Sequence, residues 1–381
     1  MKILFTQFTP PFTQVHSSLV GNKSAPEAKY LEYSDWYSNL RRLSAEKKSD
    51  TVKLVSLSET GEQFTISHDG YESLFFPVEN SEEKSKEGRC GFYAPGLVDW
   101  VRRFDPNVIH MVGTGHRMAD ELLKEGFGPR SCLWERCGLE PHKFDWPEYD
   151  LCRFLVLPTA TGIEVASKFL PREKLINFPL GANSTLFTPA RGAEKRFDIM
   201  TVGGTPRKQL HVVREIVRRN NLSWLHVGSI TKGWPFSKRE DFLFFNSMKS
   251  KLGLARVKKA KSYNYTCGFF DNTLMPGLYN SARLLVHASL VEGAPRCVQE
   301  ALASEVPVVV LKETVPYVEK EFGVACETHE EFESAVMGIL GDEVQRVKMG
   351  RAGREWLVEK HSPKRLYEAV NAVNEKIAAE K

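Results

Sequence analysis

Residues 292–311 read EGAPRCVQEALASEVPVVVL and point more directly to a fold class than any other part of the chain. An apolar stretch at residues 284–289, LLVHAS, precedes this segment, and a second one, PVVVL, closes it at residues 307–311. Both stretches are typical of buried strands, and the residues from Pro295 to Ala303 are typical of a helix between them. A strand, helix, strand unit of this kind belongs to a parallel α/β sheet, which binds ligands at the carboxyl ends of its strands.

The start of the expected helix is suited to bind an anion. Pro295 fits the first helical position, because its missing N–H would lack a partner there anyway. The N–H groups that remain, together with the helix dipole, favour a group such as a diphosphate. Glu292 precedes the helix, and Glu300 lies roughly 7 Å along it at 1.5 Å per residue. Because carboxylates accept hydrogen bonds from hydroxyls, the expected ligand is a sugar attached to a phosphate.

As a whole, this segment resembles the donor-site signature of the retaining glycosyltransferases of family 4, also described as glycosyl transferases group 1. In that signature two acids stand eight residues apart, and the matching residues here are Glu292, Gly293, Pro295, Glu300, Ala301 and Pro307, Val308 and Val309. The resemblance implies the GT-B architecture, in which two Rossmann-like domains face each other across a cleft. It also implies a C-terminal helix that crosses back to the N-terminal domain. The plain alternative is a buried strand, helix, strand unit with surface glutamates, which is common.

Length and composition indicate a two-domain globular protein. The 381 residues exceed one ordinary core, and 42% hydrophobic with 26% charged residues is typical of globular chains. Seven scattered cysteines without paired CxxC spacing indicate reduced thiols in a cytoplasmic protein, and we expect no zinc site. The apolar run at the amino terminus is too short for a signal peptide. The net charge of +4 suits an anionic nucleotide sugar or a peripheral anionic surface, and requires neither.

The alternation of strands and helices along the chain predicts a doubly wound α/β fold. We expect an N-terminal Rossmann-like acceptor domain at residues 1–182, completed by a terminal helix at residues 362–381, and a C-terminal donor domain at residues 190–361. Strands are expected at residues 2–6, 52–57, 108–112, 154–158, 198–202, 224–227, 284–288 and 306–311. Helices are expected at residues 30–47, 96–104, 116–125, 161–169 and 209–220.

A glycine turn follows the first strand of the expected donor domain. Gly203 and Gly204 would let the backbone approach a phosphate, and basic residues follow them. In the resembled family this loop supplies an arginine and a lysine that hold the donor diphosphate. Lys208 matches the lysine, whereas Gly204 stands in place of the arginine and Gln209 in place of a following glycine. Arg207 is the candidate to supply the missing charge.

The segment between the expected domains matches the linker pattern of the family. In that pattern a proline, a glycine and an aspartate precede a phenylalanine and a proline, and the positions here are Pro179, Gly181, Asn183, Phe187 and Pro189. An asparagine therefore stands where the aspartate is usual. Because Pro and Gly mark turns in all folds, the value of this match lies in its place ahead of the second domain.

Two histidines are candidates in the first domain. His110 lies near the carboxyl edge of an expected buried strand, where it would point toward the cleft and exchange a proton or bind a sugar hydroxyl. Family members have histidines at the end of this strand; one position matches His110, and the next is Val112 here. His116, in the following loop, could fill that gap. The alternative for each is a satisfied core histidine.

The first loop of the chain departs from the family pattern. Paired prolines are present, but the glycine pair that normally follows them, near the acceptor and the donor phosphate, is replaced by Thr13 and Gln14. Together with His16 and His116, these residues are the acceptor-side candidates. Their side chains would occupy space that is usually left to backbone.

A basic stretch between Lys249 and Lys261, KSKLGLARVKKAK, could form an amphipathic helix that meets an anionic membrane or substrate. The favoured alternative is a solvated helix face in the donor domain. No nucleic-acid-binding motif accompanies it.

The resemblance implies a retaining transfer of a sugar from a UDP- or GDP-sugar to an acceptor hydroxyl, with no cofactor and no divalent metal at the site. Glu292, with the backbone at Gly293 and Ala294, would bind the sugar hydroxyls, and Glu300 the ribose. Lys208 would stabilise the leaving diphosphate, so the catalytic candidates are His110, Glu292 and Lys208. Two other functions stay open: an epimerase or phosphorylase on the same fold, and a nucleotide-sugar-binding protein without turnover.

Overall fold

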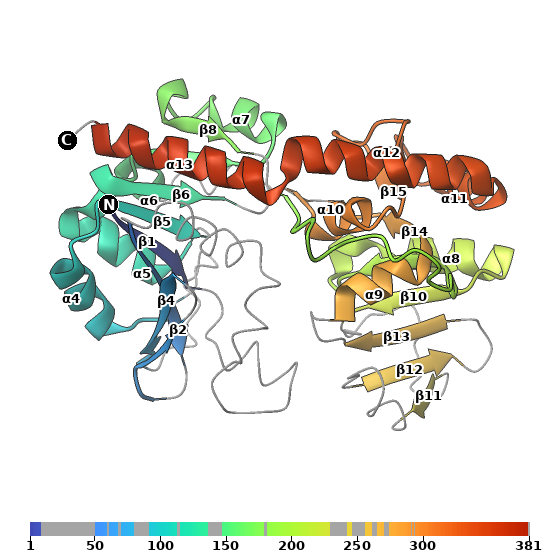
Figure 1. Cartoon of the computed structure of the whole chain (residues 1–381), viewed down its shortest axis with the longest axis horizontal. Helices are drawn as coiled ribbons and strands as arrows, with labels where there is room; N and C mark the ends of the chain where they lie inside the picture. Colours follow the sequence, from blue (N-terminus) through green and yellow to red (C-terminus); the bar gives the residue numbers. More distant parts are fainter. Residues whose placement is uncertain are drawn as a thin grey trace. The chain divides into compact units, whose positions relative to one another are not determined.

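The computed structural model describes residues 1–8, 50–58, 61–67, 70–79, 91–112, 115–135, 147–178, 181–228, 242–245, 256–260, 265–269, 274–290, 292 and 294–379. The chain divides into two compact units, one formed by Met1–Leu180 with Lys364–Lys381 and the other by Gly181–Pro363 (Figure 1). The sequence predicts the limits of the domains at residues 182, 190 and 361. The predicted helix at residues 30–47 lies outside the described residues.

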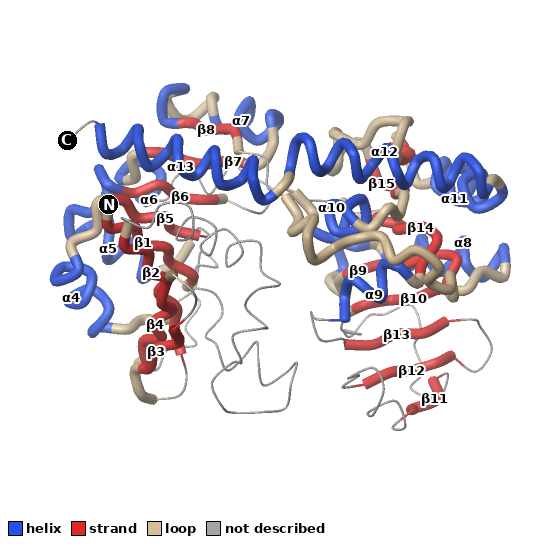
Figure 2. The backbone as a smooth tube through the Cα atoms, viewed as in Figure 1, coloured by secondary structure: helices blue, strands red, loops and turns tan. Residues whose placement is uncertain are grey.

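The described part of the first unit holds a sheet with the order β3-β4-β2-β1-β5-β6-β7-β8 (Figure 2). Its strands are β1 (Lys2–Gln7), β2 (Thr51–Ser58), β3 (Phe64–Ser67), β4 (Tyr71–Pro77), β5 (Val108–Val112), β6 (Ser131–Trp134), β7 (Phe154–Leu157) and β8 (Leu175–Asn177). All neighbours are parallel except β3 and β4, which pair antiparallel. The chain fills the sheet on one side of β1 and then returns to continue from β5 on the other side.

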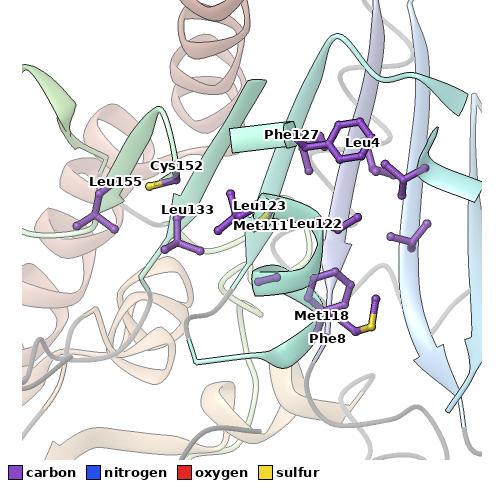
Figure 3. Packing of buried hydrophobic residues seen from close by; sticks show 14 of the residues in the cluster. Leu4, Phe8, Met111, Met118, Leu122, Leu123, Phe127, Leu133, Cys152 and Leu155 are labelled. Carbon is purple, nitrogen blue, oxygen red and sulfur yellow. The ribbon is translucent and has the colours of Figure 1, made fainter. Parts of the chain in front are cut away.

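Helices cover both faces of this sheet. They are α4 (Pro95–Phe104), α5 (Arg117–Leu122) with a π-helical turn (Leu123–Phe127), α6 (Pro147–Leu151), α7 (Ala160–Ala166) and α13 (Pro363–Ala379), with short 3₁₀ turns at Gly128–Arg130 and Arg172–Lys174. On β5, Ile109 and Met111 enter the core that α4, α5 and α7 cover, which includes Leu4, Met118 and Leu133 (Figure 3). Because side chains alternate along a strand, His110 must face the opposite side.

The C-terminal helix α13 packs against that opposite side of the first unit. Asn374 reaches His110 at 2.7 Å, and the ammonium of Lys376 lies over the ring of Phe154, 4.6 Å from its centroid. Helix α13 therefore contacts residues of β5 and β7 in the first unit. The prediction that the terminal helix crosses back to the N-terminal domain is therefore confirmed.

The second unit holds a sheet whose described strands have the order β11-β12-β13-β10-β9-β14-β15-β16. They are β9 (Phe197–Val202), β10 (Trp224–Val227), β11 (Phe242–Phe245), β12 (Arg256–Ala260), β13 (Tyr265–Phe269), β14 (Ala282–His287), β15 (Val308–Leu311) and β16 (Gly323–Cys326). The strands from β13 to β16 are parallel, whereas β12 pairs antiparallel with β11 and β13. The order reverses between β9 and β14, where the chain returns after building β10 to β13.

Two helical layers enclose the second sheet. Helices α9 (Met275–Asn280), α10 (Arg296–Ala303) and part of α12 (Glu343–His361) cover the face that carries Met200 and Leu285. Helices α8 (Leu210–Asn220) and α11 (Glu330–Gly341) cover the other face, which carries Leu284 and Val309. A short 3₁₀ turn, η5 (Pro206–Lys208), precedes α8. All four residues of β15 are buried, as expected for a strand covered on both faces.

The basic stretch between Lys249 and Lys261 does not form the predicted helix where the structure describes it. Residues 256–260 form β12, and residues 249–255 lie outside the described part. The backbone of β12 pairs with β11 on one side and with β13 on the other, so sheet pairing overrides the local helical tendency.

Contacts within the second unit explain why the linker carries a glycine and a phenylalanine. A Cβ atom added to Gly181 would overlap the carbonyl oxygen of His361 at the end of α12, so only glycine fits there. Asn183 Oδ1 accepts hydrogen bonds from the N–H and the hydroxyl of Thr185 at 3.1 and 2.6 Å. Arg354 of α12 donates to the carbonyl of Phe187 at 3.0 Å. The family glycine and phenylalanine thus fix the first turn of the second unit.

No helix among the described residues is long and apolar enough to cross a membrane.

Two helical glycines of the second unit should respond oppositely to alanine. At Gly350 of α12 an added Cβ would overlap the carbonyl of Glu305, whereas at Gly338 of α11 it would meet no atom within 4 Å. Gly350→Ala should destabilise the protein by about 1–3 kcal/mol, and Gly338→Ala should stabilise it by up to about 1 kcal/mol through helix propensity. Urea unfolding followed by circular dichroism measures both. Equal effects would contradict the packing of α12 on the end of α10.

Candidate functional site

The strongest candidate site lies at the switch point of the second sheet. Lys208 follows β9, and Glu292 follows β14. These two strands are neighbours, and the chain order reverses between them. In open α/β sheets, ligands bind outside the carboxyl ends of the strands at such a point. The fold therefore brings together two of the three catalytic candidates that the sequence predicts.

Lys208 and Glu292 form an ion pair. Lys208 Nζ contacts Glu292 Oε1, although 84 residues separate the two in sequence. Their side chains are only 12% and 9% exposed, so each charge depends on the other for compensation.

Glycine is required beneath the lysine. Gly203 has a φ of +93°, a conformation that side chains rarely adopt. A Cβ atom there would lie 3.0 Å from Lys208 Cε, so glycine also leaves room for the lysine stem. Gly228, at the end of β10, packs closely on the backbone of Gly203 and Gly204. These three glycines bring backbone together at the place where the sequence predicts a phosphate-binding turn.

The next residue along this loop departs from the family in identity. Gln209, which stands where a glycine is usual, has φ +45° and ψ +44°, a left-handed conformation that favours glycine. Its Oε1 is buried and has no hydrogen-bond partner in the described part of the chain. Arg207 is exposed, and its carbonyl accepts a hydrogen bond from the N–H of Leu290 at 3.0 Å. That bond ties the loop after β9 to the loop after β14.

All contacts of Glu292 with described residues fall on one carboxylate oxygen. Oε1 contacts Lys208, accepts a hydrogen bond from Ser289 Oγ at 2.8 Å, and lies 3.5 Å from His287 Nε2. The last distance is a long ion-pair contact rather than a hydrogen bond. Oε2 accepts no hydrogen bond from any residue that the structure describes. Among the described residues, the contacts therefore hold Oε1 of Glu292 in place.

The surroundings keep Glu292 ionised. Burial alone would raise its pKa, but the His287 imidazole and the charge of Lys208 outweigh burial and lower the pKa to about 2. The carboxylate therefore accepts hydrogen bonds throughout the neutral pH range.

The helix that carries Glu300 begins one residue later than predicted. Helix α10 starts at Arg296, and Pro295 is its N-cap with φ −65° and ψ +112°. The carbonyl of Pro295 accepts a bond from Val298 N at 3.1 Å, as the carbonyl of an N-cap residue does. Ala294 is buried beside this start, and Gly293 lies outside the described residues. Pro295 therefore precedes the helix as its N-cap and does not occupy the predicted first helical position.

Glu300 is buried and held by two neighbours. Tyr279 of α9 donates its hydroxyl to Oε2 at 2.8 Å, and Arg296 lies 3.0 Å from Oε1 in an i,i+4 ion pair. Burial and the charge of Glu300 raise the pKa of Tyr279 well above its usual value, so this phenol stays protonated.

His110 does not occupy the predicted position. Its side chain is completely buried in the first unit and stacks on Phe5, with ring centroids 4.4 Å apart. Nε2 contacts Asn374, and Nδ1 accepts a hydrogen bond from Trp134 Nε1 at 3.0 Å. Burial lowers the pKa of His110 to about 4, although the Asn374 contact opposes this. The prediction of an imidazole that points toward the cleft and exchanges a proton is wrong, and His110 is instead the satisfied core histidine that the sequence left as the alternative, because both nitrogens are engaged.

Of the acceptor-side candidates, only His116 lies among the described residues. His116 is the residue before α5 and is 5% exposed, with its ring edge-on to Phe8. Thr13, Gln14 and His16 lie outside the described residues.

Four residues of the site were missed by the sequence analysis. His287 ends the strand before Glu292, Ser289 lies in the loop that follows it, and Tyr279 and Arg296 hold Glu300. The alternating His and Ser in LLVHAS, just ahead of the acid, and the i,i+4 spacing of Arg296 and Glu300 were visible signals. The approach of Tyr279 was not, because it depends on tertiary packing. No group of three or more His, Cys, Asp or Glu in the described part of the chain is placed to hold a metal ion.

Residues 258–356 match the family model described as glycosyl transferases group 1. The resemblance to that family is confirmed. Glu292 and Glu300 lie inside the matched segment, and Lys208 lies ahead of it. No curated protein sequence gives a significant match.

Solved glycosyltransferase structures share the GT-B fold with the whole chain. Sucrose-phosphate synthase from Thermosynechococcus elongatus superposes with a TM-score of 0.72 at 15% identity, over 100% of both chains. HepE of Anabaena, in complex with UDP and glucose, gives 0.61 at 14% identity over 98% of this chain and 99% of that one. TarM of S. aureus, in a complex that includes UDP, gives 0.62 at 10% identity over the same shares. The predicted GT-B fold is therefore confirmed.

The depressed pKa of Glu292 makes a defined contribution to acid stability. Because its folded pKa of about 2 lies below the ordinary 4.5, the ionised carboxylate stabilises the fold above pH 4.5, and this contribution is lost as the pH falls toward 2. The difference in unfolding free energy between wild type and Glu292→Gln should hence shrink over that window. Urea titrations at several pH values measure it, and a difference that grows on acidification would contradict the ion pair.

Proposed function

We propose that the protein is a retaining glycosyltransferase that moves a sugar from a uridine diphosphate sugar to an acceptor hydroxyl. The observation that carries the proposal is the buried pair of Lys208 and Glu292 at the switch point of the second sheet. Support for uridine comes from HepE and TarM, whose structures were solved with UDP.

Each part of the donor has a matching group in the second unit. Lys208 and the N–H groups at the start of α10 bind the diphosphate, whose negative charge grows as the sugar leaves. Glu292 binds a hydroxyl of the sugar through Oε2, together with the backbone at Gly293 and Ala294. Glu300 accepts the ribose hydroxyls. In this assignment Ser289, Tyr279 and Arg296 position the two carboxylates.

The retaining course follows from the family resemblance. The acceptor hydroxyl attacks on the face from which the diphosphate departs, and an oxygen of the leaving phosphate receives its proton. No side-chain base is assigned, and His110 is not one, because α13 covers it. His116 with Thr13, Gln14 and His16 stay the candidates on the acceptor side.

Turnover assays separate this function from its alternatives. Release of UDP from UDP-sugars that depends on an added hydroxyl acceptor is the expected result. Conversion of the donor without acceptor would favour an epimerase, and dependence on free phosphate would favour a phosphorylase. If the donor binds tightly but no reaction occurs with any acceptor of a broad panel or with phosphate, the protein is a nucleotide-sugar-binding protein without turnover.

The two basic residues of the loop after β9 should differ in their effect on UDP binding. Lys208→Met should weaken binding by about 10- to 100-fold, because it removes a charged hydrogen bond from a partly buried site. Arg207→Met should weaken it by less than about 5-fold, because an exposed charge contributes little. Isothermal titration calorimetry measures both. Equal losses would show that Arg207 has taken over the role of the missing family arginine.

The role of Glu300 is tested by a double-mutant cycle with the ligand. Wild type should bind 2′-deoxy-UDP about 10-fold more weakly than UDP, because a carboxylate loses a hydroxyl donor. In Glu300→Gln this difference should largely vanish, since the charged acceptor is gone. A ribose preference that persists in the variant would remove Glu300 from the nucleotide site.

A further inference from the structure

His287 lies behind the ion pair at the centre of the site. It is the last residue of β14, and its side chain is buried within the second unit. Nε2 lies 3.5 Å from Glu292 Oε1, the same oxygen that Lys208 contacts. Nδ1 lies 3.5 Å from the sulfur of Cys297, in the first turn of α10. Glu292 therefore has two basic side chains near one oxygen, of which the lysine is closer.

The charged and titratable groups around His287 come from several elements. Glu292 and Cys297 face its two nitrogens, and Lys208 of η5 reaches the same carboxylate oxygen. Tyr317 stands after β15, and burial with its neighbours Cys297 and Glu292 raises the pKa of this phenol, which stays neutral. Burial lowers the pKa of His287, but Cys297 and Glu292 outweigh burial and raise it, while Lys208 opposes them.

A ligand that takes Lys208 leaves Glu292 with an uncompensated charge. The glutamate side chain is 9% exposed, so water replaces the lost lysine poorly. The low pKa of the carboxylate depends on Lys208 and His287 together, so after the lysine leaves, His287 is the remaining group of the two that can keep Glu292 ionised. A second cation must therefore approach the same oxygen, and His287 is already within 3.5 Å of it.

We propose that binding of the donor diphosphate is coupled to the uptake of a proton by His287. The diphosphate takes Lys208 from Glu292, and a proton from solvent converts His287 to the imidazolium that replaces the lysine beside Oε1. When the nucleotide leaves, Lys208 returns and the proton goes back to solvent. The inference rests on the proposed function, since it needs Lys208 to bind the diphosphate. His287 is thus a positioning residue that keeps Glu292 in place while the lysine is on the donor.

The sign of the pH dependence follows from the exchange of partners. Removing Lys208 from Glu292 and adding an anion both favour the imidazolium, so the pKa of His287 is higher in the complex than in the free protein. Nucleotide affinity should therefore rise as the pH falls between the two pKa values, and it should level off below both. The slope of log affinity against pH gives the number of protons taken up.

Calorimetry of UDP binding in buffers of different ionisation enthalpy tests the coupling. Between about pH 6 and about pH 9 the wild type should take up as much as about one proton per nucleotide bound at the optimal pH. The terminal phosphate of UDP itself titrates near pH 6, so the quantity compared is the difference between wild type and variants. A wild type that binds UDP with no proton uptake above that of the variants overturns the inference.

Two variants assign the proton, and a third controls for histidine loss. His287→Gln and Glu292→Gln should both lose the additional uptake, the first because the acceptor of the proton is gone and the second because the charge that demands it is gone. His329→Gln, at the start of α11 and outside the site, should keep the wild-type uptake. Circular dichroism checks that each variant is folded. If His287→Gln does not fold, the Glu292→Gln variant, which preserves the shape of the side chain, tests the coupling by itself.

The outcomes separate the two proposals. UDP that binds through Lys208 with the same proton uptake in wild type and in a folded His287→Gln or Glu292→Gln variant overturns the coupling and leaves the proposed function intact. UDP- and GDP-sugars that fail to bind overturn the proposed function and the coupling together. A loss of uptake in His329→Gln as well would place the titrating group elsewhere and also contradict the inference.

Discussion

The candidate site depends on one buried ion pair, in which Lys208 compensates the charge of Glu292. Neither charge is stable alone at this depth, because desolvation exceeds what a partly buried group can recover from water. An incoming diphosphate changes this balance: it offers the lysine a doubly charged partner and leaves the carboxylate to the sugar. The same pair that stabilises the protein without ligand thus presents both groups that a nucleotide sugar requires.

The fold places this pair through backbone features rather than through side-chain packing. Parallel strands β9 and β14 end side by side, and the chain reverses its order between them, so their loops meet above one edge of the sheet. Gly203 lets the lysine stem pass over the backbone, and the bond from Leu290 N to Arg207 O joins the two loops. Helix α10 starts directly beyond, which brings a positive helix terminus to the same place.

The sequence predicted features that depend on neighbouring residues better than features that depend on residues far apart in the chain. Local patterns predicted the bounds of β5 and β10 to the residue. The family resemblance pointed to Lys208 and Glu292, which the fold brings into contact, and their role stays a prediction. The strands that were not predicted are β3, β4, β6, β8, β11, β13 and β16; all but β4 have at most five residues, too few to show a distinctive period. His110 was assigned to a site because a strand does not reveal which face a later helix will cover. The stretch that became β12 was assigned to a helix because its sheet partners lie elsewhere in the chain. The partnership of His287 with Glu292 required the same tertiary information.

The central claim is that the loops at the carboxyl ends of β9 and β14 bind the diphosphate of a nucleotide sugar. A crystal structure of the protein with UDP tests it most directly. The account predicts a diphosphate within hydrogen-bond distance, about 2.7–3.2 Å, of Lys208 Nζ, ribose hydroxyls on Glu300, and a Glu292 carboxylate that no longer contacts the lysine. A nucleotide bound elsewhere, or one bound here with Lys208 still paired to Glu292, would contradict it.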